Sequence, residues 1–432
     1  MILFSISVKN TVLFLAFLFC LSSCIKIQKN VNSGEVQRTD TIEDSLVFNL
    51  TTIPTSEQTV IIEGANQVEE YLLKLRDKKV AIVGNQTSVI FKRQNKATDP
   101  FSFTHLVDSL LRLNVDVAKV FAPEHGFRGK QDAAEVVVDG KDAVTGLPVI
   151  SLYGKNKKPT PAMLKGVDMV LFDIQDVGVR FYTYISTLHY VMQTCAENNI
   201  PVMVLDRPNP NIHYVDGPVL ESNHSSFIGM HPVPLVYGMT IGEYAQMING
   251  EGWLGANLTC NLEVVKLKNY NRKATYHLPI RPSPNLPNDQ AIMLYPSLGL
   301  FEGTTVNAGR GTEMQFQIFG SPYFPKEKYT YTYIPKPNFG AKSPKYKGEL
   351  CYGLDLTKSK VQNKVNLKWL LDAYQNSTNK EAFFKTASFT LHAGTKELQK
   401  NIIAGVSLKE IEKSWQTGLK SFEKIREKYL LY

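Results

Sequence analysis

An acid, a histidine and an arginine lie together in one short segment, "FAPEHGFRG" at residues 121–129. Glu124, His125 and Arg128 follow an apolar run there, whereas an ordinary turn needs only a glycine and an aspartate. A carboxylic acid at the wall of a cleft can donate or accept a proton during cleavage of a glycosidic bond. Glu124 is therefore our candidate general acid or base. The alternative is that its charge only stabilises the start of a helix.

Two further segments combine acids with cations. "FDIQDVGVRFYTYIST" at 172–187 contains Asp176, Arg180 and Tyr182, and "FEGTTVNAGRGTE" at 301–313 contains Glu302 and Arg310. Asp173 and Asp176 could hold a metal ion, but no His or Cys accompanies them, so we expect no metal site. Arg180 could neutralise an acid or bind a substrate carboxylate through two parallel hydrogen bonds. The glycine-rich 301–313 segment could close a cleft or form a plain turn.

The elements that must position these residues are short apolar strands separated by helices. We predict strands at 79–84 and within "DVAKVFAPEHG", "LPVISLYG", "VDMVLFDIQD" and "IPVMVLDRPNP", and helices within "THLVDSLLRL" and at 184–198. Continuously apolar strands in this order are typical of a parallel sheet that is covered by helices on both faces. The fold class is therefore α/β, with a parallel sheet domain.

Polar residues follow four of these strands where each strand ends. They are Asn85-Gln86-Thr87, Glu124-His125-Gly126, Asp173-Ile174-Gln175-Asp176 and Asp206-Arg207-Pro208-Asn209. Each cluster alone could be a cap or a turn. Because the carboxyl ends of parallel strands meet at one edge of a sheet, four clusters together predict a ligand site there.

The sequence motifs argue against a dinucleotide site, a zinc site, a disulfide framework and nucleic-acid binding. "GEGWLG" at 250–255 matches a dinucleotide fingerprint, but it follows a helix-like segment rather than a strand, so these glycines end a helix and no nicotinamide cofactor is expected. Cys195, Cys260 and Cys351 have no CxxC spacing, which argues against zinc or a disulfide framework. The net charge of +8 is spread along the chain, without the basic, aromatic-interleaved block of a nucleic-acid-binding protein.

The second half of the chain differs from the first in its amino-acid composition. "RPSPNLPND" is a candidate interdomain loop, and residues 295–324 are rich in glycine and aromatics with strand propensity. We predict helices at 366–375 and 407–430, the latter starting with a capping box from Ser407 to Glu410 and burying its apolar stripe in the core. Residues 58–275 then form the sheet domain, and 276–432 form a smaller α+β domain, with the cleft between them.

The N-terminus resembles a bacterial lipoprotein signal. Lys9 precedes an apolar run from Val12 to Leu21, which is too short to span a bilayer, and small residues precede Cys24. We expect residues 1–23 to be removed, Cys24 to be lipidated, and the polar residues 24–57 to form a flexible tether. The protein would then be exported and lipid-anchored to the bacterial cell envelope, facing the periplasm or in the outer membrane. A plain secretory signal or a buried start is the alternative.

Long blocks of the chain resemble the NamZ-type exo-β-N-acetylmuramidases, from about residue 60 to the C-terminus. The blocks are "FAPEHGFRG", "TGLPVISLYG", "PTPAMLKGVDMVLFDIQDVGVRFYTYISTL", "VLDRPNP", "PSPNLP" and "LFEGTTVNAGRGTE". The resemblance implies an exported glycoside hydrolase that removes terminal N-acetylmuramic acid from the non-reducing end of peptidoglycan fragments. It also implies that residues 58–275 form a Rossmann-like domain, with the active cleft between it and the smaller C-terminal α+β domain. It assigns Glu124 as the catalytic carboxylate, with Asp176 and Glu302 as candidates for the second group. Phe127 and the loop 209–212 depart from the family pattern.

We expect the substrate to be contacted by polar and aromatic residues of these motifs: Asn85, His125, Arg128, Gln175, Arg180, Tyr182, Asn209, Asn285 and Arg310. The lactyl carboxylate of muramic acid needs a cation, for which Arg310 is the first candidate, Arg180 the second and Arg128 the third. The alternative is that all three pair with acids such as Asp176 or Glu313. The partners are peptidoglycan-derived muropeptides or disaccharides and, through the lipid, a membrane. No cofactor is expected.

Two other functions stay open at this point. The protein could be a surface lipoprotein that binds glycan or muropeptide without cleaving it. It could also be a cell-wall esterase or transpeptidase, although no serine or cysteine nucleophile motif is present. The retaining, inverting and substrate-assisted mechanisms are equally compatible with the motifs.

The lipid anchor leads to a first prediction. Replacement of Cys24 by Ser removes the thiol that would carry the lipid, so the Cys24→Ser protein should leave the membrane fraction after export. Fractionation of cells that produce each form measures this. A Cys24→Ser protein that still fractionates with lipid would contradict the anchor.

Overall fold

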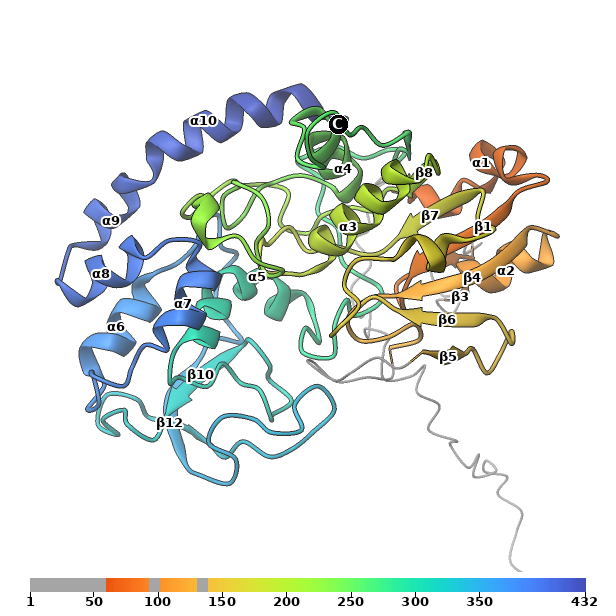
Figure 1. The fold of residues 1–432 in the computed structure, drawn as a ribbon. Coiled ribbons are helices and arrows are strands. Elements are labelled where there is room, and N and C mark those ends of the chain that lie inside the picture. Colours follow the sequence, from red (N-terminus) through yellow and green to blue (C-terminus); the bar gives the residue numbers. More distant parts are fainter. Residues whose placement is uncertain (1–59, 93–101, 130–138) are drawn as a thin grey trace, which may run out of the picture. The chain divides into compact units, whose positions relative to one another are not determined.

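The structure, a computed structural model, describes residues 60–92, 102–129 and 139–432 (Figure 1). The expected signal at 1–23, Cys24 and the tether at 24–57 lie outside the described residues. The described part of the chain falls within one compact unit. Across residues 60–92, 102–129 and 139–432, no helix is both long and apolar enough to cross a bilayer.

A seven-stranded sheet forms the centre of the first half of the chain, with the strand order β5-β6-β4-β1-β7-β8-β9. Its strands are β1 (Lys79–Gly84), β4 (Asp116–Ala122), β5 (Gly140–Lys141), β6 (Pro148–Ser151), β7 (Met169–Asp173), β8 (Val202–Leu205) and β9 (Leu262–Val265). Every pair is parallel except β5 with β6 at one edge. The expected α/β sheet is confirmed, and β5 and β9 are strands that the sequence patterns did not indicate.

Helices cover both faces of this sheet. Val80 and Ile82 pack in one apolar cluster with α1 (Val68–Leu75) and α2 (Leu106–Arg112), whereas Ala81 and Val83 pack in another with α3 (Tyr184–Glu197) and α4 (Ile241–Gly250). Successive side chains of a strand point to opposite faces, so this division shows that both faces are buried. Burial on both faces is the reason why the strands read as continuous apolar runs.

Short elements complete the first half. They are the 3₁₀ helices η1 (Gly64–Asn66), η2 (Pro161–Leu164) and η3 (Ser222–His224), and the antiparallel pair β2 (Val89–Phe91) with β3 (Phe103–His105). Gly250 is the last residue of α4, and Gly252 has φ +67°, so the glycines of "GEGWLG" end a helix as predicted.

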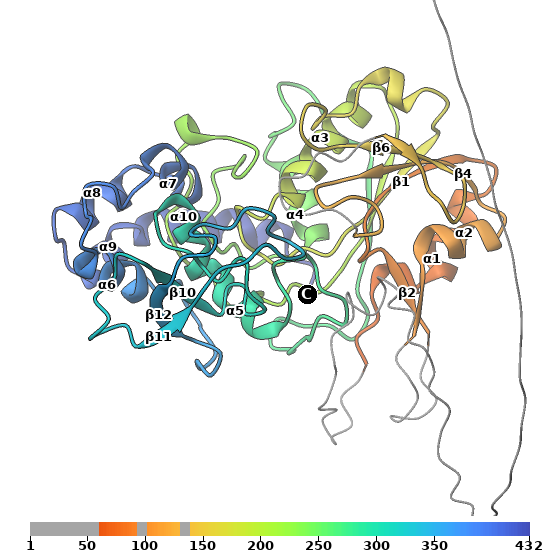
Figure 2. The same ribbon diagram turned by 90° about the horizontal axis from the view of Figure 1, so that it is seen from below.

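A smaller antiparallel sheet and a set of helices form the second half. The sheet has the order β10-β12-β11, with β10 (Ile318–Ser321), β11 (Tyr331–Tyr333) and β12 (Cys351–Asp355). The helices are α5 (Asp289–Leu298), η4 (Gly299–Gly303), α6 (Lys368–Asn376), α7 (Thr386–Ala393), α8 (Glu397–Ile403), α9 (Leu408–Ser414), α10 (Gln416–Arg426) and η5 (Glu427–Tyr429). Seen from below, the small sheet and α6 to α9 lie on one side and the large sheet on the other (Figure 2).

The structure corrects two element predictions in this half. Residues 295–303 continue α5 and enter η4, so strand structure in the 295–324 segment is limited to β10. The α5 helix begins at Asp289 because the side chain of Asn288 caps it, accepting a hydrogen bond from the backbone N–H of Ala291 at 2.9 Å. The helix expected at 407–430 is divided at Trp415 into α9 and α10. Its capping box at Ser407 and Glu410 is present, and its apolar stripe packs into the core as predicted.

The C-terminal helix returns to the sheet domain. In Figure 1, α10 runs from the second half to the neighbourhood of α4, where the chain ends. Arg426 donates through Nη2 to the carbonyl of Gly238 at 2.8 Å, and the hydroxyl of Tyr432 donates to Asp206 Oδ2 at 2.7 Å. One continuous apolar cluster also includes residues of both halves. The boundary at 275/276 remains a prediction, since the two halves share a core.

A buried ion pair lies at the carboxyl end of the large sheet, and loss of one of its partners should be strongly destabilising. Arg207 donates to both oxygens of Asp173, at 2.6 and 2.9 Å, and both side chains are buried. An Arg207→Met variant leaves a buried carboxylate without its cation, which should cost about 3–5 kcal/mol in the free energy of unfolding. Urea denaturation measures this. As a control, Lys158→Met removes the more exposed pair with Glu197 and should cost far less. Equal losses in both variants would contradict the prediction.

Candidate active site

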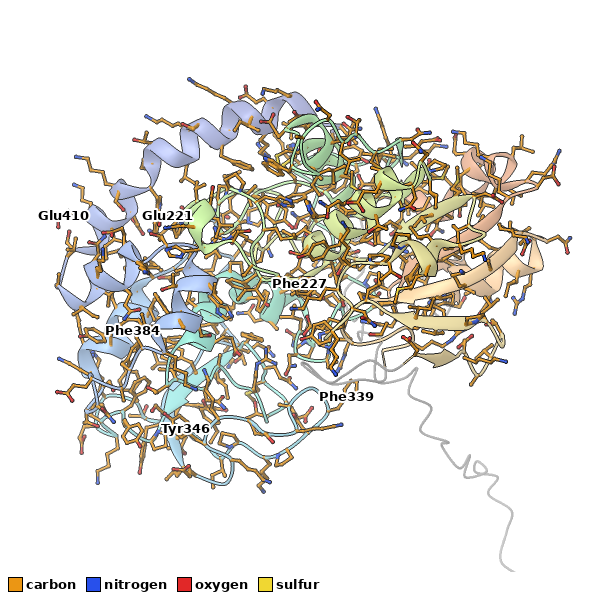
Figure 3. The ribbon with its side chains drawn as sticks, viewed as in Figure 1. Glu221, Phe227, Phe339, Tyr346, Phe384 and Glu410 are labelled. Atoms are coloured by element: carbon orange, nitrogen blue, oxygen red, sulfur yellow. The ribbon has the colours of Figure 1, made fainter. Side chains whose placement is uncertain are left out.

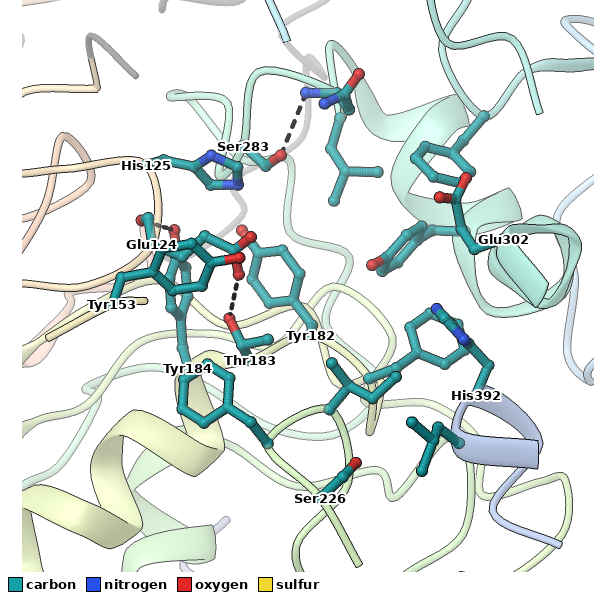
Figure 4. Close-up of a pocket in the computed structure, with 18 of the residues that line it drawn as sticks. Glu124, His125, Tyr153, Tyr182, Thr183, Tyr184, Ser226, Ser283, Glu302 and His392 are labelled. Carbon is teal, nitrogen blue, oxygen red and sulfur yellow. Dashed lines mark hydrogen bonds between the residues drawn. The ribbon is translucent and has the colours of Figure 1, made fainter. Parts of the chain in front are cut away.

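A pocket of about 370 Å³ lies beyond the carboxyl ends of β4 and β6. One wall comes from the first half of the chain and includes Glu124, Tyr153 and Thr183, and the opposite wall includes Glu302 and His392 from the second half (Figure 4). The volume lies within the usual range for sites that bind small molecules. The expected cleft between the two halves is confirmed.

Glu124 reaches this pocket because of a tight turn after β4. His125 and Gly126 both have positive φ, +72° and +78°, and the N–H of Gly126 donates to the carbonyl of Pro123 at 3.0 Å. Such φ values are uncommon for a residue other than glycine, and at His125 they mark a constrained backbone of the kind found at functional sites. Glu124 is half-buried and lines the pocket, as does His125.

Hydroxyl groups hold the Glu124 carboxylate in place. Thr183 Oγ1 donates to Glu124 Oε2 at 2.8 Å (Figure 4). Burial and then the Glu124 carboxylate, with which its hydroxyl forms a hydrogen bond, raise the pKa of Tyr153. The Tyr153 hydroxyl is therefore a neutral hydrogen-bond donor at physiological pH. These contacts fix the orientation that proton transfer requires.

The polar residues after β1 are connected to Glu124 through the hydroxyl of Tyr184. Asn85 is fully buried and donates through Nδ2 to the hydroxyl of Tyr184 at 2.9 Å. That hydroxyl lies 3.4 Å from the carbonyl oxygen of Glu124. The other end of the amide is also used, because Asn85 Oδ1 accepts from the N–H of Thr87 at 2.9 Å. Asn85 does not line the pocket, and its amide instead holds the hydroxyl of Tyr184, which does.

The opposite wall holds Glu302 as an ion. Arg310 Nε lies 3.1 Å from Glu302 Oε1, and the guanidinium stacks over the ring of Phe316 at 5.1 Å. Burial alone would raise the pKa of Glu302, but the charges of Arg310 and then Lys345 oppose it and bring the value to about 2. A carboxyl group with this pKa is ionised at any working pH. It can stabilise positive charge or accept a hydrogen bond, but it cannot donate a proton.

Asp176, the other candidate for the second catalytic group, lies outside the pocket. Its Oδ2 atom accepts from the N–H of Gly178 at 2.8 Å and from the hydroxyl of Tyr237. Burial raises the pKa of Asp176 to about 6. Of the three candidate acids, the structure therefore brings Glu124 and Glu302 together at one cavity and places Asp176 in the core.

The three candidate arginines have different surroundings. Arg128 donates to Asp108 and to Asp142, with its shortest distances at 2.9 and 2.8 Å, and does not line the pocket. Arg180 is fully buried and donates to four backbone carbonyls, at 2.7 to 3.1 Å. Only Arg310 of the three lines the pocket, and it pairs with Glu302 rather than with Glu313.

The remaining predicted substrate contacts divide in the same way. Tyr182 and Asn285 line the pocket, and Tyr182 donates to the carbonyl of Pro282 at 2.7 Å. Gln175 and Asn209 are buried beneath it, where their amides donate to the carbonyls of Pro208 at 2.6 Å and Met239 at 2.8 Å, respectively. These two residues hold loops together.

The sequence patterns missed several pocket residues. Thr183 and Tyr153 lie within motifs that were recognised, but nothing in those motifs indicated that they contact Glu124. Phe227, Phe316 and His392 lie in segments without a chemical signature, and they reach the pocket only through long-range packing. Within the described ranges, no three His, Cys, Asp or Glu side chains are grouped as a metal ion would require.

The lowered pKa of Glu302 predicts a pH dependence of stability. Because the folded-state pKa of about 2 lies below the ordinary 4.5, the stabilisation is fully present above pH 4.5 and is lost as the pH falls towards 2. A Glu302→Gln variant should be less stable at pH 7, since Arg310 loses its partner, and should lose less stability than the wild type between pH 5 and 3. Urea denaturation at both pH values measures this. Glu327→Gln, at an exposed site, should keep the wild-type slope; an unchanged slope in Glu302→Gln would contradict the assignment.

Comparison with known proteins identifies the family. Residues 80–290 match the N-terminal domain of exo-beta-N-acetylmuramidase NamZ, and residues 293–432 match its C-terminal domain. The peptidoglycan beta-N-acetylmuramidase NamZ of Bacillus subtilis (strain 168) is 39% identical over 382 residues, which cover 84% of this chain and 89% of that protein. Two crystal structures of DUF1343 family proteins from Bacteroides fragilis NCTC 9343 are also similar. The first has a TM-score of 0.76 and 42% sequence identity, and the match covers 87% of this chain and 99% of that protein. The second has a TM-score of 0.71 and 29% sequence identity, and the match covers 86% of this chain and 99% of that protein. The chain belongs to the exo-beta-N-acetylmuramidase NamZ family.

Proposed function

We propose that this protein is an exo-acting glycoside hydrolase that releases terminal N-acetylmuramic acid from the non-reducing end of peptidoglycan fragments. Family membership and the relative from Bacillus subtilis support the substrate class. The observation that carries the proposal is the pocket itself, in which Glu124 is held by Thr183 on one wall and the ionised Glu302 lies on the other.

The two carboxyl groups suit different tasks. During hydrolysis the bond between the anomeric carbon and the leaving oxygen breaks, and that oxygen takes a proton from Glu124. Water then supplies hydroxide to the anomeric carbon and returns a proton to Glu124. Positive charge develops on the sugar ring between these events. Glu302 is ionised throughout and can stabilise that charge from the opposite wall.

The other lining residues fit an N-acetylated sugar. Tyr182, Tyr295 and Phe316 present aromatic surface to the pocket, as sugar-binding sites commonly need to cover the apolar faces of the ring. Asn285 donates through Nδ2 to the carbonyl of Gly340 at 2.7 Å, while its Oδ1 atom is buried without a hydrogen-bond partner among the described residues. An acetamido N–H at this oxygen would remove that unfavourable state.

The proposal includes a location. Peptidoglycan itself lies outside the cytoplasm, so an enzyme that acts on its fragments there would be exported. The signal-like residues 1–23 and Cys24 support export with a lipid anchor in the cell envelope, and residues 24–57 would then let the enzyme reach muropeptides at a distance from the membrane.

Replacement of Glu124 by Gln tests the function. Gln keeps the shape of the side chain but cannot transfer the proton, so kcat should fall about 10²–10⁴-fold. Release of 4-nitrophenol from 4-nitrophenyl β-N-acetylmuraminide measures turnover. The matched control is Glu313→Gln, an exposed glutamate outside the pocket, which should retain wild-type turnover. A wild-type protein that binds the glycoside without cleaving it would instead be a muropeptide-binding lipoprotein, and a fully active Glu124→Gln variant would remove Glu124 from the mechanism.

A further inference from the structure

Preference for N-acetylmuramic acid over N-acetylglucosamine requires a positive charge at the pocket. The first sugar carries a lactyl ether that ends in a carboxylate, and the second has a hydroxyl group at the same carbon. A carboxylate that enters a partly buried site without a partner loses hydration that nothing replaces. The question of which side chain supplies the charge rests on the proposed function.

The pocket offers two basic side chains as candidates. Among the residues that the structure describes, Lys157 and Arg310 are the only Lys or Arg side chains that line it. Arg310 is already paired with Glu302 at 3.1 Å. Lys157 makes no ion pair with any carboxylate in residues 60–92, 102–129 and 139–432. Burial lowers the pKa of His392, so this imidazole is neutral at physiological pH and does not compete.

The loop after β6 holds Lys157 at the pocket wall. On its C-terminal side, Lys158 pairs with Glu197 at 2.7 Å, and the carbonyl of Pro159 accepts from Thr194 Oγ1 at 2.9 Å. Both contacts fix the loop to α3. The ammonium of Lys157 lies 4.7 Å from the centroid of the Phe227 ring, a cation–π distance that restrains the side chain and leaves its N–H groups free to donate elsewhere.

Phe227 also connects Lys157 to the acid. Its ring lies 6.3 Å from the ring of Tyr153, whose hydroxyl forms a hydrogen bond with Glu124. Phe227 stacks on Tyr190 of α3 as well, at 6.2 Å and an interplanar angle of 10°. Figure 3 shows Phe227 in the middle of the molecule, between the large sheet and the C-terminal helices. Lys157 therefore lies on the same wall of the pocket as Glu124. A sugar bound with its glycosidic oxygen towards Glu124 would have its ring substituents near this wall.

We propose that Lys157 is a specificity-determining residue that binds the lactyl carboxylate of N-acetylmuramic acid, with Phe227 as the surface that places its ammonium. Arg310 then serves to hold Glu302 ionised, and the two pocket cations have separate roles. Lysine suits this role because its three donors can follow a carboxylate that is carried on a flexible ether.

The test compares two substrates in matched variants. Lys157→Met keeps an unbranched side chain of similar length but removes the ammonium that lies over Phe227. The ratio of kcat/KM for the 4-nitrophenyl β-glycosides of N-acetylmuramic acid and N-acetylglucosamine should fall roughly 10- to 100-fold, the range for a hydrogen bond to a charged group. Lys155→Met removes the same charge from an exposed position in the same loop and should keep the wild-type ratio.

Each outcome decides the proposal. It is wrong if Lys157→Met keeps the ratio, if both variants change it equally, or if the wild type does not distinguish the sugars. A ratio lost in Arg310→Met but kept in Lys157→Met would return the role to Arg310. If the wild type cleaves neither glycoside, the proposed hydrolase activity fails separately, and calorimetric binding of the two free sugars to wild type and Lys157→Met then decides the role of Lys157.

Discussion

The buried ion pair between Arg207 and Asp173 connects the loops on which the active site rests. Asp173 ends β7 and Arg207 follows β8, so the pair joins two neighbouring strands at their carboxyl ends. Arg207 also donates to the carbonyl of Val89 at 3.0 Å, and Ser88 donates to the carbonyl of Asp173, which adds the loop after β1. Two charges taken out of water at this place are tolerated only because both are paired and hydrogen-bonded. Three of the four polar clusters at the sheet edge are thereby locked together.

This network explains why most polar residues at the sheet edge do not touch the pocket. Asn85, Gln175 and Asn209 use their amides on backbone carbonyls or on other side chains of the same loops. Loops that cross the edge of a parallel sheet leave backbone groups without partners, and buried groups of this kind need them. The clusters are therefore mainly a rigid support, and the side chains that face the cavity, such as Thr183 and Tyr184, are positioned by that support.

Features that depend on the order of neighbouring residues, such as the strands and the charged residue after a strand, could be predicted from the sequence. The apolar runs indicated five strands of the sheet because burial on both faces leaves few polar positions within a strand, and Glu124 was found because a charged residue just beyond such a strand is conspicuous. Partner choice was not predictable. Arg128 and Arg180 lie in motifs as polar as that of Arg310, yet Arg128 finds two acids, one of them in α2, and Arg180 finds carbonyls up to 213 residues away. The opposite wall was equally hidden, since its geometry depends on the packing of the second half.

The position of that wall relative to Glu124 depends on contacts between the halves. Arg180 follows the β7 motif, and it donates to the carbonyls of Pro218 and Val233 from the first half and to those of His392 and Ala393 at the end of α7. His392 lines the pocket, so one guanidinium fixes this part of the wall to the sheet domain. Gly394, with φ +78°, ends α7 directly against the guanidinium, where a Cβ atom would clash with it. An arginine outside the pocket can thus determine the separation of Glu124 and Glu302, because the distance between two carboxyl groups on different halves is only as well defined as the contacts that join those halves.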